Sequence, residues 1–404
     1  MRIQKNKLIE NIELLLIFTF CIYTFWFQYG VMIIAPLITI TGLGMLLVFL
    51  VRNRILAKQF YKNLSLLFAF IVFAAITGVL FSGIKNQVID WVIQIMKFLI
   101  PMLSIIDYVR DQEEKCRKVM WIITLSGFLL SVYAISNGTR VSNSGITLGD
   151  LNTNVLASYL VLTVFAILFL FSEARFTQRL FLAGAYAVSL LAVFNSASRR
   201  GAIQFVVLSA AYLYFFCVKT GKGKVGQKFI LIAIAICSVI YLLSSFSSLL
   251  ESSALLQRLT GGGDTAQSDM LRKLYQLNAL TLFKSSPIFG CGLGSVATYG
   301  GVHSHSLYFE SLACTGIIGL LLIVSFLILN IRSLLLNLKG ISNGETKMTI
   351  LFTASFIALI LLTGIQVTYI YDSFFYIMIG CFVSISNCVK SNLYKNDKNR
   401  FELV

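Results

Sequence analysis

Long apolar segments constrain the fold of this chain more than any other feature of its sequence. Twelve mostly apolar runs occur, and a run of roughly 18 to 22 residues is long enough to cross a bilayer as a helix. A membrane-spanning barrel would instead show strands of about ten residues with alternating polarity. We therefore predict an all-α polytopic membrane protein with about twelve transmembrane helices. The runs cover residues 11–28, 31–51, 64–82, 88–108, 119–136, 153–172, 178–195, 201–218, 228–247, 313–333, 347–365 and 370–388.

The charge distribution predicts how these helices are oriented. Only 12% of the 404 residues are charged, about half the share in soluble domains. If the N-terminus is cytoplasmic, 24 of the 33 Lys and Arg residues fall on the inner side, as the positive-inside rule requires. Both termini are therefore predicted to be cytoplasmic. The net charge of +16 reflects this topology and contact with anionic membrane lipids. It does not indicate nucleic-acid binding, because no soluble basic domain is present.

Two of the predicted outer loops are long, at residues 137–152 and 248–304. Long loops inside compact proteins are usually functional. We therefore divide the chain into a nine-helix membrane region at 1–247, an external catalytic loop at 248–312, and a three-helix membrane region with a cytoplasmic tail at 313–404.

The second of these loops has internal order. Residues 269–284 carry apolar side chains at helical spacing, and Ser268 and Asp269 are residue types that cap helices. Glycines at 290, 292 and 294 predict a tight turn, and 304–312 is predicted as a second short helix that leads into the tenth span. The glycine pattern is not a dinucleotide fingerprint, because no βαβ unit surrounds it. The eight cysteines show no CxxC pair or metal spacing and are interpreted as buried apolar residues.

Arg199 and Arg200 oppose the positive-inside rule, because they join the seventh and eighth spans on the predicted outer side. Arginines at helix ends can simply extend to the headgroups. They also present planar donors that suit phosphate, and Gly201 lies at the start of a predicted helix, where anions are favoured. We favour the second interpretation, an anion site.

Further polar residues are predicted on the same side. Arg258 and Arg272 lie in the long loop, and the only two histidines, His303 and His305, lie at its end. Together with Arg199 and Arg200 this set suits a diphosphate, whereas no DxD motif indicates a metal clamp. Histidine titrates near neutral pH and serves as a general base, so His305 is the candidate base. Asp372, at the outer start of the last span, is predicted to orient a base or to contact an acceptor.

Four segments in this order resemble the O-antigen ligase/polymerase superfamily. The turn SASRRG at 196–201 is similar to a TxSRGG-like turn, and 286–294 (SPIFGCGLG) fits an SPxxGxGxG segment. HSLYFE at 305–310 is similar to an HNxxLE-like motif, and TGIIG at 315–319 to the helix start that follows it. Asn154 lies in DLNTN at 150–154. This segment leads into the sixth span and is similar to the Asn-rich segment of the family. The similarity extends over about residues 150–320.

The resemblance implies a fold like that of GT-C glycosyltransferases and an enzyme of the bacterial cytoplasmic membrane. Its substrate would be an undecaprenyl-diphosphate-linked glycan on the outer face, with no metal ion or cofactor. Arg199 (or Arg200) and Arg272 would hold the diphosphate, and His305 would activate the acceptor hydroxyl. Ser306 stands where Asn usually follows the histidine, which leaves His303 as an alternative base. Further substrate contacts are expected from Arg200, Arg258, His303, Tyr308, Glu310, Asn154 and Asp372.

Three functions remain open at this point. The first is a Wzy-type polymerase that joins lipid-linked repeat units of O-antigen, capsular or exopolysaccharide by single displacement, with inversion at the anomeric carbon. The second is a ligase of the same family, which differs in its acceptor. The third is a flippase for lipid-linked oligosaccharide, although transporters usually show internal repeats, and none is visible here. A chain-length regulator and a separate flippase are the protein partners that the resemblance implies.

Overall fold

A computed structural model describes most of the chain, and within the described residues the protein is helical apart from turns and one short strand pair. Among these residues, eight helices are long and apolar enough to cross a membrane, which confirms the prediction of an all-α, multi-pass membrane protein. The described residues are 2–26, 35–51, 62–140, 146–147, 153–218, 265–341, 344–363 and 368–401.

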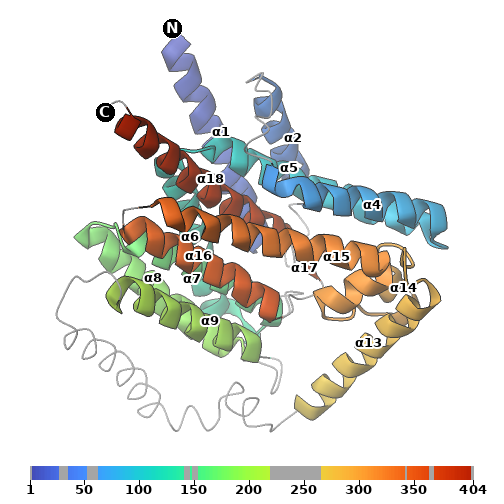
Figure 1. Cartoon of the computed structure of the whole chain (residues 1–404). Helices are drawn as coiled ribbons and strands as arrows, with labels where there is room; N and C mark the ends of the chain where they lie inside the picture. The colour runs from blue at the N-terminus through green and yellow to red at the C-terminus, as the bar shows by residue number, and fades with distance from the viewer. Residues whose placement is uncertain are drawn as a thin grey trace, which may run out of the picture.

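The elements before the long loop form the first part of the bundle (Figure 1). They are α1 (Arg2–Trp26), α2 (Ala35–Val51), the 3-10 turn η2 (Lys62–Leu64), α4 (Ser65–Phe81), α5 (Lys85–Val109), α6 (Glu113–Asn137), the antiparallel pair β1 (Thr139–Arg140) and β2 (Ile146–Thr147), α7 (Thr153–Phe171), α8 (Phe176–Asn195), α9 (Arg199–Tyr212) and the π-helix η4 (Leu213–Val218).

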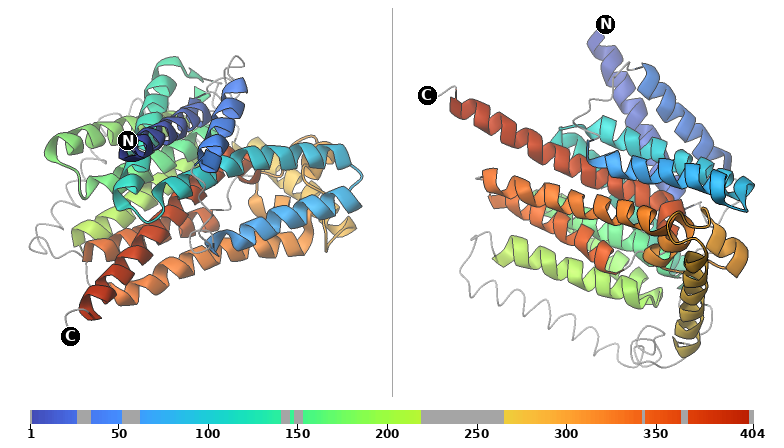
Figure 2. Two further views of the ribbon diagram at one scale, coloured as in Figure 1. Left: turned by 90° about the horizontal axis from the view of Figure 1, so that it is seen from above. Right: turned by 45° about the vertical axis from the view of Figure 1, so that its right-hand side comes forward.

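The elements from the long loop onward complete the described structure. They are α13 (Thr265–Ser285), α14 (Ser295–Gly300), α15 (Leu307–Leu336), the 3-10 turn η5 (Asn337–Gly340), α16 (Gly344–Leu362), α17 (Thr368–Tyr371) and α18 (Ser373–Phe401). Figures 1 and 2 show α13 at the end of the molecule away from both termini, running across the direction of α15 and α16.

Among the described residues, each predicted span corresponds to a helix, except 228–247, which lies outside them. The helices are often longer than the apolar runs. The helix predicted at 119–136, for example, begins at Glu113, and i,i+4 ion pairs join Glu113 to Arg117 at 2.9 Å and Glu114 to Lys118 at 3.0 Å. Such pairs support a helix beyond its apolar part. The apolar parts of α2 and α16 are shorter than the eight long spans.

The core is centred on α7 and α18, which are the most enclosed of the long apolar helices. Aromatic rings fill the space between helices there. The ring of Phe165 on α7 stacks on Phe356 of α16 at 4.6 Å and meets Phe382 of α18 edge-on at 5.8 Å. Offset and edge-on pairs of this kind add to the gain from apolar packing. Cys21, Cys116, Cys314, Cys381 and Cys388 are buried, in agreement with their interpretation as packing residues, whereas Cys291 is partly exposed.

α15 is broken at Gly316, whose backbone is non-helical at φ 64° and ψ −167°. Glycine is needed there for two reasons. The positive φ is unfavourable for other residues, and a Cβ would lie 2.2 Å from the Ile288 carbonyl oxygen. Residues 307–315 therefore form a short helix before the membrane span, as the sequence predicted for 304–312.

The glycine-rich loop at 286–294 fills the break in α15. A kinked helix leaves backbone groups without their usual partners, and buried ones must find others. Here the loop supplies them, so the two segments form one unit. Cys291 N–H donates to the Ala313 carbonyl at 2.8 Å, Gly292 N–H to the Cys314 carbonyl at 3.0 Å, and Ile317 N–H to the Pro287 carbonyl at 2.9 Å.

Candidate functional site

The first turn of α9 carries Arg199 and Arg200, and its geometry is set by Ser198. The Ser198 hydroxyl accepts the Gly201 N–H at 3.2 Å, which caps the helix. The same hydroxyl donates to Asn154 Oδ1 at 2.8 Å. The structure therefore places Asn154, a predicted substrate contact, behind the cap of α9, where it fixes the position of the two arginines.

Gly201 allows α9 to approach α7 closely. A Cβ at this position would lie 2.4 Å from the Cβ of Ala157. The glycine of the SASRRG segment thus has a packing role in addition to its predicted place at a helix start. The close approach brings the arginine-bearing turn against the most enclosed part of the bundle.

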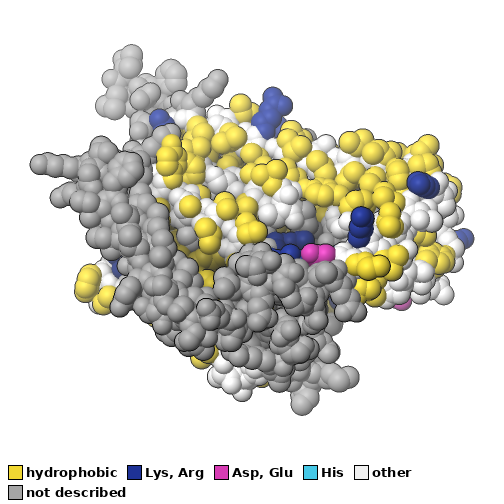
Figure 3. Space-filling view, turned by 90° about the horizontal axis from the view of Figure 1, so that it is seen from below, with side chains coloured by type: hydrophobic (Ala, Val, Ile, Leu, Met, Phe, Trp, Pro, Cys, Tyr) yellow, Lys and Arg dark blue, Asp and Glu magenta, His cyan; other side chains and the backbone are white. Residues whose placement is uncertain are grey.

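Arg199 meets Arg272 through a shared carboxylate. Asp269 Oδ1 lies 2.7 Å from Arg199 Nη2 and 3.5 Å from Arg272 Nη1. The prediction that Asp269 caps the loop helix is wrong, because α13 begins at Thr265 and Asp269 lies inside it. Its carboxylate is free to bind the two guanidinium groups instead. Figure 3 shows basic side chains directly beside an acidic one at the edge of a broad hydrophobic surface.

His305 lies among positive charges and is only partly exposed. Its backbone has a positive φ of 55°, which is uncommon for a residue other than glycine. Its ring centroid is 5.9 Å from that of Tyr275 on α13. Burial lowers the pKa of His305, and the charges of Arg272, His303 and Arg200 lower it further, against an opposing effect of Glu310. This environment favours the neutral imidazole, the form that accepts a proton.

His303 has a different environment from His305. Its Nδ1 lies 2.9 Å from Glu310 Oε1, and the other oxygen of Glu310 accepts the Ser304 N–H at 3.0 Å. Glu310 is fully buried at 0% exposed. It is thus placed to hold the 303–306 loop rather than to face a substrate, although the sequence predicted it as a substrate contact. The His303 ring lies 5.8 Å from that of Trp91 and 5.6 Å from that of Tyr371.

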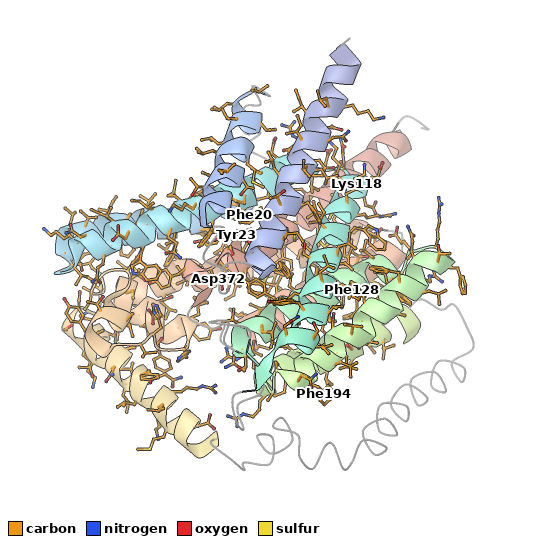
Figure 4. The ribbon with its side chains drawn as sticks, turned by 180° about the vertical axis from the view of Figure 1, so that it is seen from behind. Phe20, Tyr23, Lys118, Phe128, Phe194 and Asp372 are labelled. Carbon is orange, nitrogen blue, oxygen red and sulfur yellow. The ribbon has the colours of Figure 1, made fainter. Side chains whose placement is uncertain are left out.

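Tyr308 and Asp372, also predicted as substrate contacts, lie at joints between helices. The Tyr308 hydroxyl donates to the Leu361 carbonyl at the end of α16. Asp372 is 1% exposed, and its Oδ1 accepts the Tyr159 hydroxyl at 2.9 Å and the Phe374 N–H at 3.1 Å, so it caps α18. Figure 4 shows Asp372 inside the bundle, whereas Lys118, near the start of α6, lies apart from it. Arg258, the remaining predicted contact, lies outside the described residues.

Sequence reasoning did not include Trp91, Tyr275 or Tyr371 in the site. Tyr371 accepts the Gly294 N–H at 3.2 Å, and a Cβ on Gly294 would lie 2.1 Å from Trp91 Nε1. The rings of Trp91 and Tyr371 thus pack against both His303 and the glycine-rich loop, whereas that of Tyr275 contacts His305. Aromatic residues make up 13% of this chain, so no local pattern separates these three from ordinary packing residues. Among the described residues, no group of three His, Cys, Asp or Glu side chains is placed to hold a metal ion.

Comparison with known proteins gives one family. A family model described as O-antigen ligase matches residues 184–324, a segment that contains both site arginines of α9, Arg272 and both histidines. No curated protein matches the chain. A solved structure described as "Structural coordination of polymerization and crosslinking by a peptidoglycan synthase complex" aligns at 10% identity and a TM-score of 0.47, covering 83% of this chain and 98% of the other. The family match supports the predicted resemblance of this segment to the O-antigen ligase/polymerase superfamily.

Proposed function

We propose that the chain is a glycosyltransferase that joins undecaprenyl-diphosphate-linked oligosaccharide repeat units into O-antigen, capsular or exopolysaccharide. One observation carries this proposal: Arg199 and Arg272 meet at Asp269, and the charges of Arg272 and Arg200 lie close enough to His305 to help burial lower its pKa. Guanidinium groups suit a diphosphate, and a neutral imidazole suits a hydroxyl that must lose its proton. The family match supports chemistry of the O-antigen ligase/polymerase type.

The reaction would be a single displacement. An acceptor hydroxyl attacks the anomeric carbon of the donor, a new C–O bond forms, and the bond from that carbon to the diphosphate oxygen breaks. The electron pair leaves on undecaprenyl diphosphate, and the hydroxyl proton passes to His305. The arginines stabilise the charge that develops on the leaving diphosphate, an effect worth on the order of a hundredfold in rate or more for a single donor. This route inverts the anomeric configuration and requires no metal ion.

The same donor site would serve a ligase, which is the second candidate. The matching family model is described as O-antigen ligase, and this match supports the ligase as well as it supports the polymerase. A polymerase and a ligase differ only in whether the acceptor is another lipid-linked repeat unit or a different molecule. A flippase is less well supported, because transporter sites lie near the bilayer midplane, whereas Arg199 and His305 lie at helix ends.

The proposal includes a location and partners. We place the protein in the bacterial cytoplasmic membrane with both termini in the cytoplasm and the Arg199–His305 cluster on the outer face. A flippase would deliver the substrate to that face, and a chain-length regulator would act on the product. If the protein were itself the flippase, loss of Arg199 would leave lipid-linked units on the inner face rather than unpolymerised units on the outer face.

The test is transfer by the purified, detergent-solubilised protein. One defined undecaprenyl-diphosphate-linked repeat unit is supplied and the products are separated on a gel. We expect a ladder that disappears in Arg272→Ala and His305→Ala, and that persists in Lys284→Gln, which removes an exposed charge from the far end of the same helix.

Other outcomes of this assay separate the alternatives. A single transfer to an added acceptor lipid would replace the polymerase with the ligase, and no product from folded protein would reject both. The product linkage, determined by NMR, should be inverted relative to the donor. Addition of a metal chelator should leave the ladder unchanged. If the chelator abolishes the ladder, the metal-independent route is rejected.

A further inference from the structure

Asp269 places one carboxylate oxygen between the two arginines that we assign to the donor diphosphate. The distances from Oδ1 are 2.7 Å to Arg199 Nη2 and 3.5 Å to Arg272 Nη1. Arg199 is supplied by α9, whereas Asp269 and Arg272 are supplied by α13, 70 residues farther along the chain. A single anionic oxygen thus bridges two guanidinium groups on separate helices, which is the position that a phosphate oxygen would take between them.

This bridge occupies donors that the reaction needs. An arginine presents its N–H groups in a fixed plane, so the N–H of Arg199 Nη2 that points at Asp269 cannot donate to a phosphate oxygen at the same moment. A carboxylate and a phosphate fit the same guanidinium fork. The two anions therefore compete for one place, and a bound diphosphate beside an unmoved Asp269 would also experience repulsion between like charges.

The bridge is also exposed enough to exchange. Side-chain exposure is 48% for Asp269, 33% for Arg199 and 34% for Arg272. Ion pairs with this much contact with solvent are weak, because water and salt screen them. A diphosphate brings several charged oxygens to the same donors and should displace a single carboxylate.

We propose that Asp269 is an internal competitor of the donor diphosphate, holding Arg199 and Arg272 together in the empty site and leaving them when the donor binds. The proposal rests on the proposed function for the role of the arginines. It gives Asp269 a defined effect: removal of its carboxylate should strengthen the binding of any small diphosphate. A carboxylate that merely positions the arginines would have the opposite effect.

Inorganic pyrophosphate is the probe, and its dissociation constant for the full-length protein in detergent is measured by calorimetry. Asp269→Asn and Asp269→Ala should bind it more tightly than the unaltered protein, by about fivefold, as expected for the loss of an exposed ion pair. Arg272→Ala should bind it more weakly. Asp90→Asn removes a charge from an exposed position near the start of α5 and should leave the constant unchanged.

Unchanged or weaker binding in both Asp269 variants, in protein that elutes and unfolds like the parent, overturns the proposal. Failure of the proposed function is a separate result. The parent protein could form no glycosidic bond with lipid-linked units while the Asp269 variants bind pyrophosphate more tightly. In that case the competitor role of Asp269 is supported and the proposed glycosyl transfer is rejected. If transfer occurs and depends on Arg272 but the Asp269 variants bind no more tightly, the reaction stands and the competitor is rejected.

Discussion

At the scale of single residues, the two histidines have different roles although only Ser304 separates them. His303 is held by the buried carboxylate of Glu310 at 2.9 Å. His305 is surrounded by the charges of Arg272, His303 and Arg200. A paired imidazole is fixed in orientation, whereas one beside cations stays neutral and available as a base. The structure therefore favours His305 over His303 as the proton acceptor.

This difference is measurable because the chain has only two histidines. Burial and neighbouring cations lower the pKa of His305 from 6.5. Both effects disfavour the protonated form, so the neutral base persists to more acidic pH, and kcat/KM should decline only as the pH falls through a midpoint below 6.5. NMR of histidine-labelled, tag-free protein gives the pKa directly. Arg272→Gln removes a positive charge and should raise it; an unchanged value would show that His305 and Arg272 lie too far apart to interact.

Glu310 is the residue on which the loop around both histidines depends. Its two oxygens hold His303 and the Ser304 N–H. Glu310→Gln keeps the shape but replaces one acceptor oxygen with an amide donor. We expect at least a tenfold loss of transfer and a free energy of unfolding lower by about 1–3 kcal/mol, the cost of a buried polar group left without its partner. Transfer assays and chemical unfolding test this. Parent-like activity would mean that the loop keeps its shape without the carboxylate.

At the scale of elements, the break in α15 and the glycine-rich loop support the site together. Gly316→Ala would force a side chain into a positive φ and to 2.2 Å from the Ile288 carbonyl oxygen. Strain of this kind costs about 1–3 kcal/mol before the clash is counted, so we expect a clear fall in the thermal midpoint. Gly344→Ala is the matched control, because its Cβ would meet nothing within 4 Å. Equal midpoints for the two variants would show that the break is not required for stability.

The helices were predictable from the sequence, because length and apolar content suffice to identify a membrane span. The helix at 269–284 was predicted from the spacing of its apolar residues, and a second short helix was predicted at 304–312, before the tenth span. The sequence did not predict that the loop at 286–294 would pair with the break in α15. Its hydrogen bonds use backbone groups of segments more than twenty residues apart, and no side-chain pattern records them.

Candidate site residues could be selected from the sequence where their charge opposes the expected membrane topology. Polar side chains in apolar surroundings were harder to interpret. Arg199 and Arg200 stood out because they oppose the positive-inside preference. Asn154, Glu310 and Asp372 were predicted to contact the substrate, whereas in the structure their side chains bind other parts of the protein. A polar residue in an apolar chain must have a partner, and sequence does not tell whether that partner is a substrate or a helix end. Asp372, just before a helix, did carry a capping signal.

At the scale of the whole molecule, the described polar cluster and the chain termini lie at opposite ends. Figures 1 and 2 show α13 and α14 at one end and both termini at the other. Lys118, near the start of α6, lies apart from Asp372 in Figure 4. A bundle of this kind separates one membrane face from the other. The site and the termini should therefore be exposed to different compartments.

Cysteine labelling of intact cells can decide which compartment each end faces. Lys284 is exposed on α13, and the Glu114 side chain is 83% exposed on α6, so Lys284→Cys and Glu114→Cys should both react freely with a maleimide that can reach them. In a Cys291→Ser background, which removes the partly exposed native thiol of the described residues, a membrane-impermeant maleimide should label Lys284→Cys in intact cells. Glu114→Cys should be labelled only after permeabilisation. The reverse pattern would place the arginine cluster in the cytoplasm, where a glycan already moved to the outer face cannot reach it, and would reject outer-face transfer whatever the chemistry of the site.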